Sequence, residues 1–420
     1  MVETLTIILL PVYAVSLYFM ITILLKIIEI DNKKQIKKGL KEHPFATIAI
    51  PAYNEEDTLK ETAESVLKLE YPKTRFEIII INDGSKDKTE AVAREIIREN
   101  KNRKIILLNQ ENKGKAEALN NALLKAKGEY FACLDADSIV NTKALKEQII
   151  TFNQQGKKAG AITPIMLVQS PKKFVEWIQY IEYIISAFLQ HTIGEMDAIF
   201  VTPGPFSLYR TEVIKNLGGF SKETVTEDQE MAYKIQKEGY KIKQCAEAYV
   251  TTKAPKTWKQ LYYQRRRWFY GGIQCLTKYK GLVLNKKYGD FGMFQLPMNI
   301  AFYILAIIGL GAFAYIEGKA LNNWLKLLNA SGYDIWTLIK TSTLPKINIF
   351  TINMISAGLF IITTIIILYI FIKAHKHVKR KITIKEAITF IPFAFYYYLF
   401  PAIVIITLIP TIIQRKKYWW

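Results

Sequence analysis

The stretch FEIIIINDGSKD, residues 76–87, sets the fold class of this chain. An unbroken run of isoleucines, Ile78 to Ile81, suits a strand that is buried on both faces. The run ends at Asn82, where residues typical of a turn take over. A strand covered on both faces indicates a parallel sheet between layers of helices.

The neighbouring segments repeat this pattern of an apolar run followed by a polar turn. FATIAIPAYNEE comes before the isoleucine run, and KIILLNQ and YFACLDADS come after it. Segments with helical spacing separate the runs: DTLKETAESVLKLEY, DKTEAVAREIIRE and GKAEALNNALLKAKG. Strands that alternate with helices predict an α/β domain with a mostly parallel, covered sheet.

Both ends of the chain are apolar. The segment LTIILLPVYAVSLYFMITILLKII has about 24 residues, enough to cross a hydrocarbon core of ~30 Å, and it predicts a transmembrane helix over residues 1–30. A signal peptide is the alternative, but it would need a basic start, and this chain has Glu3 there. A C-terminal transmembrane region of about three spans is predicted over residues 290–420. Its apolar segments lie near residues 293–316, 349–372 and 387–413.

The positions of the lysines predict which side of the membrane each segment faces. Basic residues follow the first apolar segment, at Lys26 and within 33–38, and the loop KAHKHVKRKITIK between the last two segments is also basic. Positive loops face the cytosol, so residues 45–285 are predicted to form a cytosolic domain. The C-terminal QRKKYWW then falls outside, against this rule. Three prolines in the last segment leave a re-entrant path open beside a single span.

The composition narrows the classes of partner. A net charge of +20 with 50% hydrophobic residues suits anionic lipid or anionic substrates. No zinc-finger, homeodomain or RNA-platform signature supports nucleic acid. Cys133, Cys245 and Cys275 lie far apart and predict reduced, buried thiols. His375 and His377 lie in a lysine run without metal spacing, so we expect them at a solvated surface.

Each predicted strand ends in a polar cluster. Ligands of parallel sheets bind at the carboxyl ends of strands, so four clusters on one edge describe a cleft. In LDAD, Asp135 and Asp137 can both reach one hard cation, Mg²⁺ or Mn²⁺, that keeps positions for phosphate. A turn, or a helix cap at Ser138, is the structural alternative. The clusters are Asn54–Glu56, Asn82–Ser85, Asn112–Lys115 and Asp135–Asp137.

Three further acidic residues each allow a structural and a functional interpretation. Asp83 in INDGSKDKT either closes a turn or contacts the base or ribose of a nucleotide. Glu227 and Asp228 in VTED precede a helical segment, so they either cap that helix or supply a general base.

Two amphipathic stretches predict helices at the membrane surface. SPKKFVEWIQYIEYIISAFLQHT, near residues 171–192, is too polar to span, and a core helix is its alternative. LYYQRRRWFYGGIQCLTKY, near 258–280, mixes arginines with aromatic residues. Within it, Arg265 and Arg266 either contact lipid or lie at the surface, and Trp268 either stacks on a sugar or anchors the interface.

The motifs IPAYNEE, INDGSKDKT, NKGKAEALNNAL, LDAD, VTED and QRRRW occur in the order seen in family 2 glycosyltransferases with a GT-A fold. Over residues 45–275 the set resembles membrane-embedded synthases of chitin, hyaluronan, cellulose and especially bacterial poly-N-acetylglucosamine. The resemblance implies an α/β GT-A catalytic domain in the cytosol, joined to transmembrane and interfacial helices in the cell membrane.

The resemblance also implies roles for individual residues. Asp83 resembles the acidic residue that contacts the nucleotide. Asp135 and Asp137 resemble the metal motif, with Asp137 as the ligand proper. Asp228 resembles the general base, with Glu227 beside it. The residues that would surround the base, the phosphates and the acceptor sugar are Ala52, Tyr53, Glu55, Lys113, Gln264, Arg267 and Trp268.

The activity implied is that of a processive, inverting glycosyltransferase. It would use a nucleotide sugar, UDP-N-acetylglucosamine or UDP-glucose, with Mg²⁺ or Mn²⁺ to elongate a polysaccharide and pass it across the membrane. Four spans are few for a sugar-wide channel, so a homo-oligomer or a small membrane partner would complete it. The expected partners are the donor, a growing glycan or lipid acceptor, and membrane lipids.

Three alternatives remain beside this interpretation. A single-transfer glycolipid glycosyltransferase would share the motifs, and product length separates the two. A polyprenyl-phosphate sugar synthase usually lacks QxxRW. An inactive scaffold is disfavoured because the acidic motifs and Arg267 are all present. The segment VTPGPFSLYR resembles an acceptor-site loop, but Pro203 and Pro205 depart from the pattern and leave the acceptor open.

Overall fold

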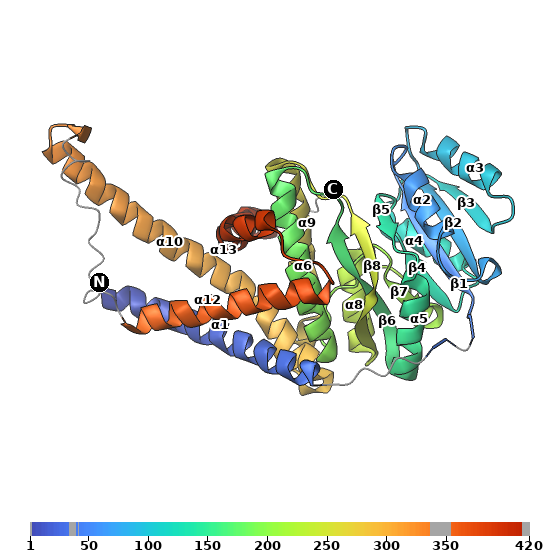
Figure 1. Cartoon of the computed structure of the whole chain (residues 1–420), viewed down its shortest axis with the longest axis horizontal. Coiled ribbons are helices and arrows are strands. Elements are labelled where there is room, and N and C mark those ends of the chain that lie inside the picture. The colour runs from blue at the N-terminus through green and yellow to red at the C-terminus, as the bar shows by residue number, and fades with distance from the viewer. Residues whose placement is uncertain (1, 33–38, 41, 337–353, 414–420) are drawn as a thin grey trace.

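The structure, a computed structural model, describes residues 2–32, 39–40, 42–336 and 354–413. An α/β part and a set of long helices that project from it make up the molecule (Figure 1). The eight strands of the α/β part form one sheet in the order β3-β2-β1-β4-β7-β6-β8-β5. The predicted fold class, a mostly parallel sheet with a helical C-terminal region, is confirmed.

The first half of the sheet is the part that the sequence predicted. β2 is parallel to β1 and β3, and β1 is parallel to β4. All residues of β2 are buried, as the isoleucine run requires. The strands are β1 Ala46–Ala52, β2 Phe76–Asp83, β3 Ile105–Gln110 and β4 Tyr130–Cys133, and the helices between them are α2 Leu59–Leu67, α3 Thr89–Glu99 and α4 Lys115–Lys125.

The second half of the sheet is mixed and was not predicted. β7 is antiparallel to β4 and β6, β8 is parallel to β6, and β5 is antiparallel to β8. β5 and β7 are three residues long, too short for a periodic signal, so tertiary pairing alone makes them strands. The bounds are β5 Ser138–Val140, β6 Ala159–Val168, β7 Leu208–Arg210, β8 Lys241–Thr252, α5 Ala144–Gln155, α7 Thr211–Asn216 and α8 Glu227–Lys237.

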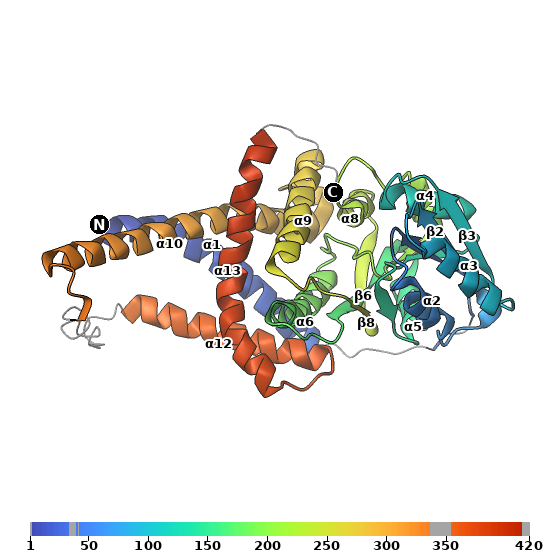
Figure 2. The ribbon, with the colours of Figure 1, turned by 90° about the horizontal axis from the view of Figure 1, so that it is seen from above.

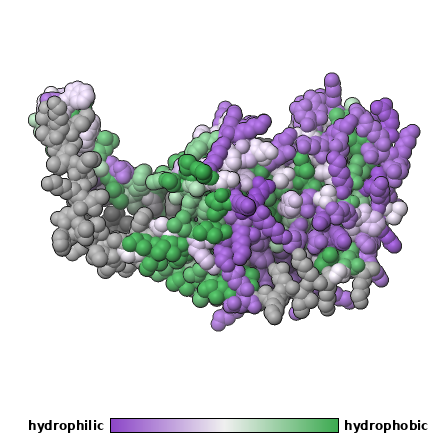
Figure 3. All heavy atoms as spheres, viewed as in Figure 1, coloured by the Kyte–Doolittle hydropathy of each residue, from purple (hydrophilic) through white to green (hydrophobic). Residues whose placement is uncertain are grey.

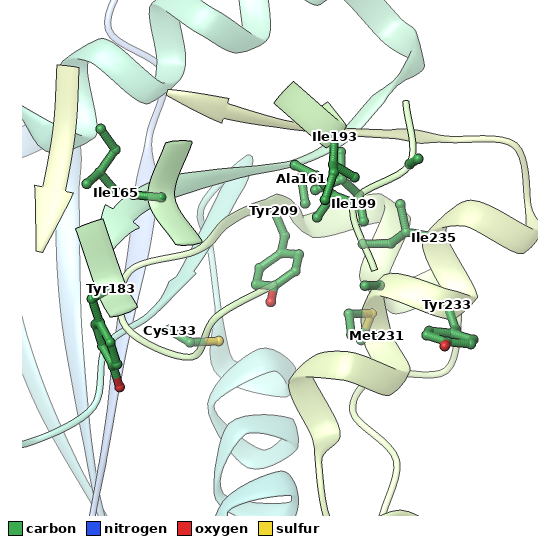
Figure 4. Packing of buried hydrophobic residues seen from close by; sticks show 14 of the residues in the cluster. Cys133, Ala161, Ile165, Tyr183, Ile193, Ile199, Tyr209, Met231, Tyr233 and Ile235 are labelled. Carbon is green, nitrogen blue, oxygen red and sulfur yellow. The ribbon is translucent and has the colours of Figure 1, made fainter. Parts of the chain in front are cut away.

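Helix α6, Phe174–Glu195, joins the two parts of the molecule. It packs on β6 and β8 on one side and on α12 and α13 on the other. Figure 4 shows buried side chains of α6, β6, β7 and α8 that form one core, among them Tyr183, Ile165, Tyr209 and Met231. Phe174 is 52% exposed, but the rest of the predicted interfacial flank is buried or half-buried against protein.

The long helices spread away from the sheet (Figures 1 and 2). Hydrophobic residues gather over this part, and hydrophilic residues cover the α/β part (Figure 3). Two stretches of the described chain are long and apolar enough to cross a membrane, Phe291–Ala330 and Ile384–Thr411. The other two predicted spans stay predictions. The helices are α1 Val2–Asp31, α9 Trp258–Lys278, α10 Leu296–Ala330, α12 Met354–His377 and α13 Ile384–Ile413.

Short helices connect the larger elements. A π-helical turn leads directly into α10, and the others lie in loops. They are η1 Lys73–Arg75, η2 Gly156–Lys158, η3 Lys280–Leu282, η4 Lys286–Tyr288 and η5 Phe291–Gln295.

The C-terminal helices differ from the prediction in length. α10 has 35 residues and is about 52 Å long, so it continues past residue 316, where the predicted apolar segment ends. α13 runs through its three prolines as one helix, and its path through the membrane stays a prediction. The lysines within 33–38, the start of the segment 349–372 and the C-terminal QRKKYWW lie outside the described residues.

The histidine prediction is wrong and the cysteine prediction is confirmed. His375 is only 1% exposed and packs edge-on against Phe371, and the ring of His377 lies 4.7 Å from that of His191. The end of α12 packs on α6, so these imidazoles face protein while Lys376 faces outward. The three cysteines are free and buried.

Candidate active site

The carboxyl ends of β1 to β4 meet at one edge of the sheet, because these strands are parallel neighbours. The loops after β1 and β2 hold each other there. The backbone N–H of Asn54 donates to Ser85 Oγ at 3.1 Å, and Asn54 Oδ1 accepts from the N–H of Lys86 at 2.9 Å. The N–H of Glu55 donates to Thr89 Oγ1 at 2.8 Å. The first two polar clusters are therefore one cross-linked unit.

Asp83 is satisfied by the loop that follows β3. Its Oδ1 accepts from Gln110 Nε2 at 2.7 Å and from the backbone N–H of Lys113 at 3.0 Å. Its Oδ2 accepts from the N–H of Gly114 at 3.0 Å, and the residue is 4% exposed. Gly114 has a φ of +86°, a conformation that glycine adopts without strain. Asp83 thus fixes the loop that starts α4.

Lys115, the first residue of α4, lies among carboxylates. Its Nζ is 2.5 Å from Asp135 Oδ1 and 3.1 Å from Glu227 Oε1. Burial disfavours the charged amine, but the attraction of these two carboxylates and of Asp228 outweighs burial and holds the pKa of Lys115 well above its ordinary value. This cation connects the end of β4 to the start of α8.

The VTPGPFSLYR loop closes over this ion pair. A Cβ at Gly204 would lie 2.6 Å from Lys115 Nζ and 3.1 Å from both carboxylate oxygens of Asp135, so only glycine fits without displacing them. Thr202 Oγ1 donates to the backbone oxygen of Asp228 at 2.8 Å. The loop is thereby fixed against both acidic segments.

Asp228 lies in the first turn of α8 and is half-buried. Burial first, and then the charge of Glu227, raises the pKa of Asp228 to about 6, while Lys115 and Arg267 oppose the rise. Its Oδ1 accepts from the N–H of Gln229 at 2.8 Å. A carboxylate with a pKa near neutrality can take up a proton during a reaction.

Helix α9 packs tightly against the start of α8. A Cβ at Gly271 would lie 2.1 Å from Thr226 Oγ1, so the glycine permits this approach. Gln274 Oε1 accepts from the N–H of Val225 at 3.0 Å, and Lys278 Nζ lies 2.6 Å from Glu230 Oε1. These contacts explain how the VTED and QRRRW segments meet although about forty residues separate them.

Asp135 and Asp137 are the two carboxylates that the sequence predicted to bind a divalent cation. Burial, followed by the charge of Asp135, raises the pKa of Asp137, and a bound cation would relieve this repulsion. Burial also raises the pKa of Glu55, to which both aspartates contribute. Within the described chain no three His, Cys, Asp or Glu side chains form a metal-binding group. Two carboxylates leave positions for water and phosphate, as Mg²⁺ prefers.

The QRRRW residues on α9 have different environments. Arg267 is exposed, and its charge reaches Asp228. Gln264 Oε1 is buried and has no hydrogen-bond partner among the described residues. Trp268 is half-buried and packs on the core. Arg265 is not at a lipid surface: it is buried in an ion pair with Glu182 of α6.

The other predicted site residues occupy the strand-end loops. Ala52 is buried at the end of β1, and Tyr53 is 43% exposed beside it. Lys113 is exposed and contributes its backbone N–H to Asp83. The structure adds Lys115, which lies in the same polar cluster as Lys113. The sequence placed both lysines at the strand end but did not show which one turns inward.

The chain is similar in sequence to known glycosyltransferases. Residues 47–218 match the family described as "Glycosyl transferase family 2". Over 265 residues the chain is 33% identical to the poly-beta-1,6-N-acetyl-D-glucosamine synthase of Staphylococcus aureus (strain MSSA476), covering 63% of this chain and 62% of that protein. Over 230 residues it is 35% identical to the enzyme of that name from Staphylococcus epidermidis, covering 54% and 55%.

A solved structure shares the fold. It is a mannosyltransferase from Pyrobaculum calidifontis in complex with GDP-Man and Mn²⁺, with a TM-score of 0.64 and 18% identity, covering 80% of this chain and 95% of that one. The GT-A fold expected from the sequence is confirmed, as is the resemblance to family 2 enzymes. The chain matches less than two thirds of the length of the two synthases.

Proposed function

Residues 47–218 form a glycosyl transferase family 2 domain, and from this we propose that the chain is a membrane-integrated, processive, inverting glycosyltransferase. One observation carries the proposal. A half-buried carboxylate with a pKa of about 6, Asp228, lies in the same cluster as the Lys115–Asp135 pair at the strand ends. A base for the acceptor and charges for a phosphorylated donor are thus brought together.

Asp228 activates the acceptor. It takes the proton from an acceptor hydroxyl as the hydroxyl oxygen attacks the anomeric carbon of the donor. The bond from that carbon to the diphosphate breaks in the same step, so the anomeric configuration inverts. Burial, and after it the charge of Glu227, keeps the pKa of Asp228 high, so that the base is matched to a cytosolic pH.

Basic residues and a cation bind the donor and neutralise the leaving diphosphate. Arg267 and Lys115 supply positive charge for the leaving diphosphate. Asp135 and Asp137 would hold Mg²⁺ or Mn²⁺, which supplies Lewis-acid neutralisation of that charge. Asp83 and Tyr53 lie on the loops expected to surround the nucleotide. Gln264 and Trp268 would hold the acceptor sugar, whose apolar face stacks on an indole ring.

The similarity to poly-N-acetylglucosamine synthases supports a nucleotide-sugar donor, with UDP-N-acetylglucosamine as the first candidate. The two candidate spans support a location in the cell membrane with the domain on the cytosolic side. Export of the polymer, and any oligomer or partner that assists it, belong to the same proposal.

A single-transfer glycolipid enzyme is the alternative. An open apolar groove of about 320 Å³ favours it, because this groove is lined by α9, α10 and α13 and could take a lipid chain. Its lining includes Ile273, Tyr303 and Ile405.

The experiment uses the full chain in nanodiscs with Mg²⁺ or Mn²⁺. Each radiolabelled nucleotide sugar is offered in turn, and products are sized by gel and by solvent partition. A long water-soluble polymer supports the proposal and names the sugar. One labelled sugar in the organic phase would establish the alternative. Release of no nucleoside diphosphate from any donor would refute both.

A further inference from the structure

A buried ion pair joins the QRRRW helix to the rest of the protein. Arg265 of α9 and Glu182 of α6 are 2.8 Å apart, and their side chains are 7% and 15% exposed. Tyr396 of α13 donates its hydroxyl to the same oxygen of Glu182 at 3.2 Å. Burial raises the pKa of Glu182, and Arg265 counteracts the rise. Three helices therefore meet at one charged contact.

The same arginine covers Trp268. The guanidinium carbon of Arg265 is 4.1 Å from the centroid of the ring, a cation–π distance, and the two residues are one helical turn apart. One face of the indole is thus occupied by a group that Glu182 holds in place. Trp268 is half-buried, so part of its ring stays accessible beside this contact.

The contact extends to a candidate membrane span. α13 packs on both α9 and α6 and passes close to them (Figure 2). Tyr396 also lies between aromatic rings, 6.2 Å from Trp258 and 5.2 Å from Phe400. The orientation of Trp268 is therefore connected, through two side chains, to a helix of the membrane region.

We propose that Glu182 and Tyr396 are positioning residues that hold Trp268 through Arg265 and thereby set how firmly the growing glycan is retained between additions. This inference rests on the proposed function and deepens it at the acceptor site. A stacking residue binds its ligand best when its own orientation is already fixed. Loss of the ion pair frees the indole, weakens glycan binding and shortens the product.

The test compares Glu182→Gln and Tyr396→Phe with wild type. Glu182→Gln keeps the shape and removes the charge, and Tyr396→Phe removes only one hydrogen bond. We expect Kd for the oligosaccharide product to rise about tenfold in Glu182→Gln and about threefold in Tyr396→Phe. Product length should fall in the same order, while Kd for the nucleoside diphosphate stays within about twofold. Glu182→Asp should restore part of the length.

Thr407→Val is the matched control. Tyr262 of α9 donates its hydroxyl to Thr407 of α13 at 2.9 Å, so this variant removes another α9–α13 contact without touching Arg265. Its product length should equal that of wild type. Unchanged glycan affinity in both Glu182→Gln and Tyr396→Phe would overturn the inference, as would equal shortening in Thr407→Val. Glycan binding is measured by calorimetry without turnover, so an inactive wild type would refute the proposed function separately.

Discussion

Two acidic positions at the same edge of the sheet have opposite environments. Asp83 accepts three hydrogen bonds from the loop after β3 and is almost fully buried. Asp137 accepts from Ser138 at 3.0 Å, lies beside the charge of Asp135, and has a raised pKa. The comparison separates two carboxylates at one sheet edge: Asp83 stabilises a loop, and Asp137, half-buried beside another negative charge, is the one for which we propose a cation.

The largest effect is expected from Asp137→Ala. The variant removes one of two carboxylates available to a cation, so the leaving diphosphate loses several kcal/mol of charge stabilisation, and sugar transfer should fall about 10³-fold. Transfer is measured as nucleoside diphosphate release across a Mg²⁺ and Mn²⁺ titration. Ser138→Ala, which removes only a hydrogen bond to Asp137, should lose less than about tenfold. Equal losses in the two variants would contradict a cation role.

Asp228→Asn should have the next largest effect. An amide cannot accept the acceptor proton, so transfer should fall by about 10²-fold or more while Kd for the nucleotide changes little. Glu238→Gln, at the exposed far end of α8, serves as the control. Full activity in Asp228→Asn would show that another group is the base.

The pH profile refines the assignment of the base. Asp228 has to be ionised to accept a proton, and its pKa in the folded protein is about 6. Below that pH, kcat/KM should fall about tenfold for each pH unit, and above it the profile should level. Glu227→Gln removes the charge that helps to raise this pKa, so the inflection should move to lower pH. If the inflection does not move, Glu227 does not influence the pKa of the catalytic base.

Asp83→Asn should have the smallest effect on turnover and should act on stability instead. One amide oxygen cannot replace two carboxylate oxygens that accept three hydrogen bonds, so the free energy of unfolding should fall by about 2 kcal/mol. Thermal unfolding of the full chain, with and without UDP, measures this change. Asp290→Asn, at an exposed residue, should leave Tm unchanged. A loss of nucleotide affinity with unchanged Tm would make Asp83 a ligand contact instead of a loop anchor.

The sequence predicted the first four strands because their signals are local. β2 is an uninterrupted apolar run, and the turn residues that follow each strand need no partner to be recognised. In the second half of the sheet, β5 and β7 were not predictable because these short strands acquire extended structure only by pairing with β8, β4 and β6.

The candidate site was predicted in part. Motif order brought Asp135, Asp228 and Arg267 into one hypothesis. In the structure Asp135 and Asp228 both act on the charge of Lys115, and Arg267 acts on Asp228. Lys113 was chosen as the site residue instead of Lys115, because two lysines flank Gly114 and only the conformation of that turn decides which one faces the carboxylates. The prediction that Arg265 lies at the surface or against lipid was wrong. A stretch of arginines and aromatic residues has the same sequence pattern whether it lies at a membrane surface or forms a buried ion pair.

By itself the sequence determined the α/β class, the apolar ends and the residue types of the site, because hydrophobic period and turn chemistry act over a few residues. Only the tertiary structure decided which charges meet. Lys115, Asp135 and Glu227 come from three separate segments, and Arg265, Glu182 and Tyr396 from three more. A pKa or an ion pair depends on burial and on distances of a few ångströms between such segments, and a linear pattern does not contain them.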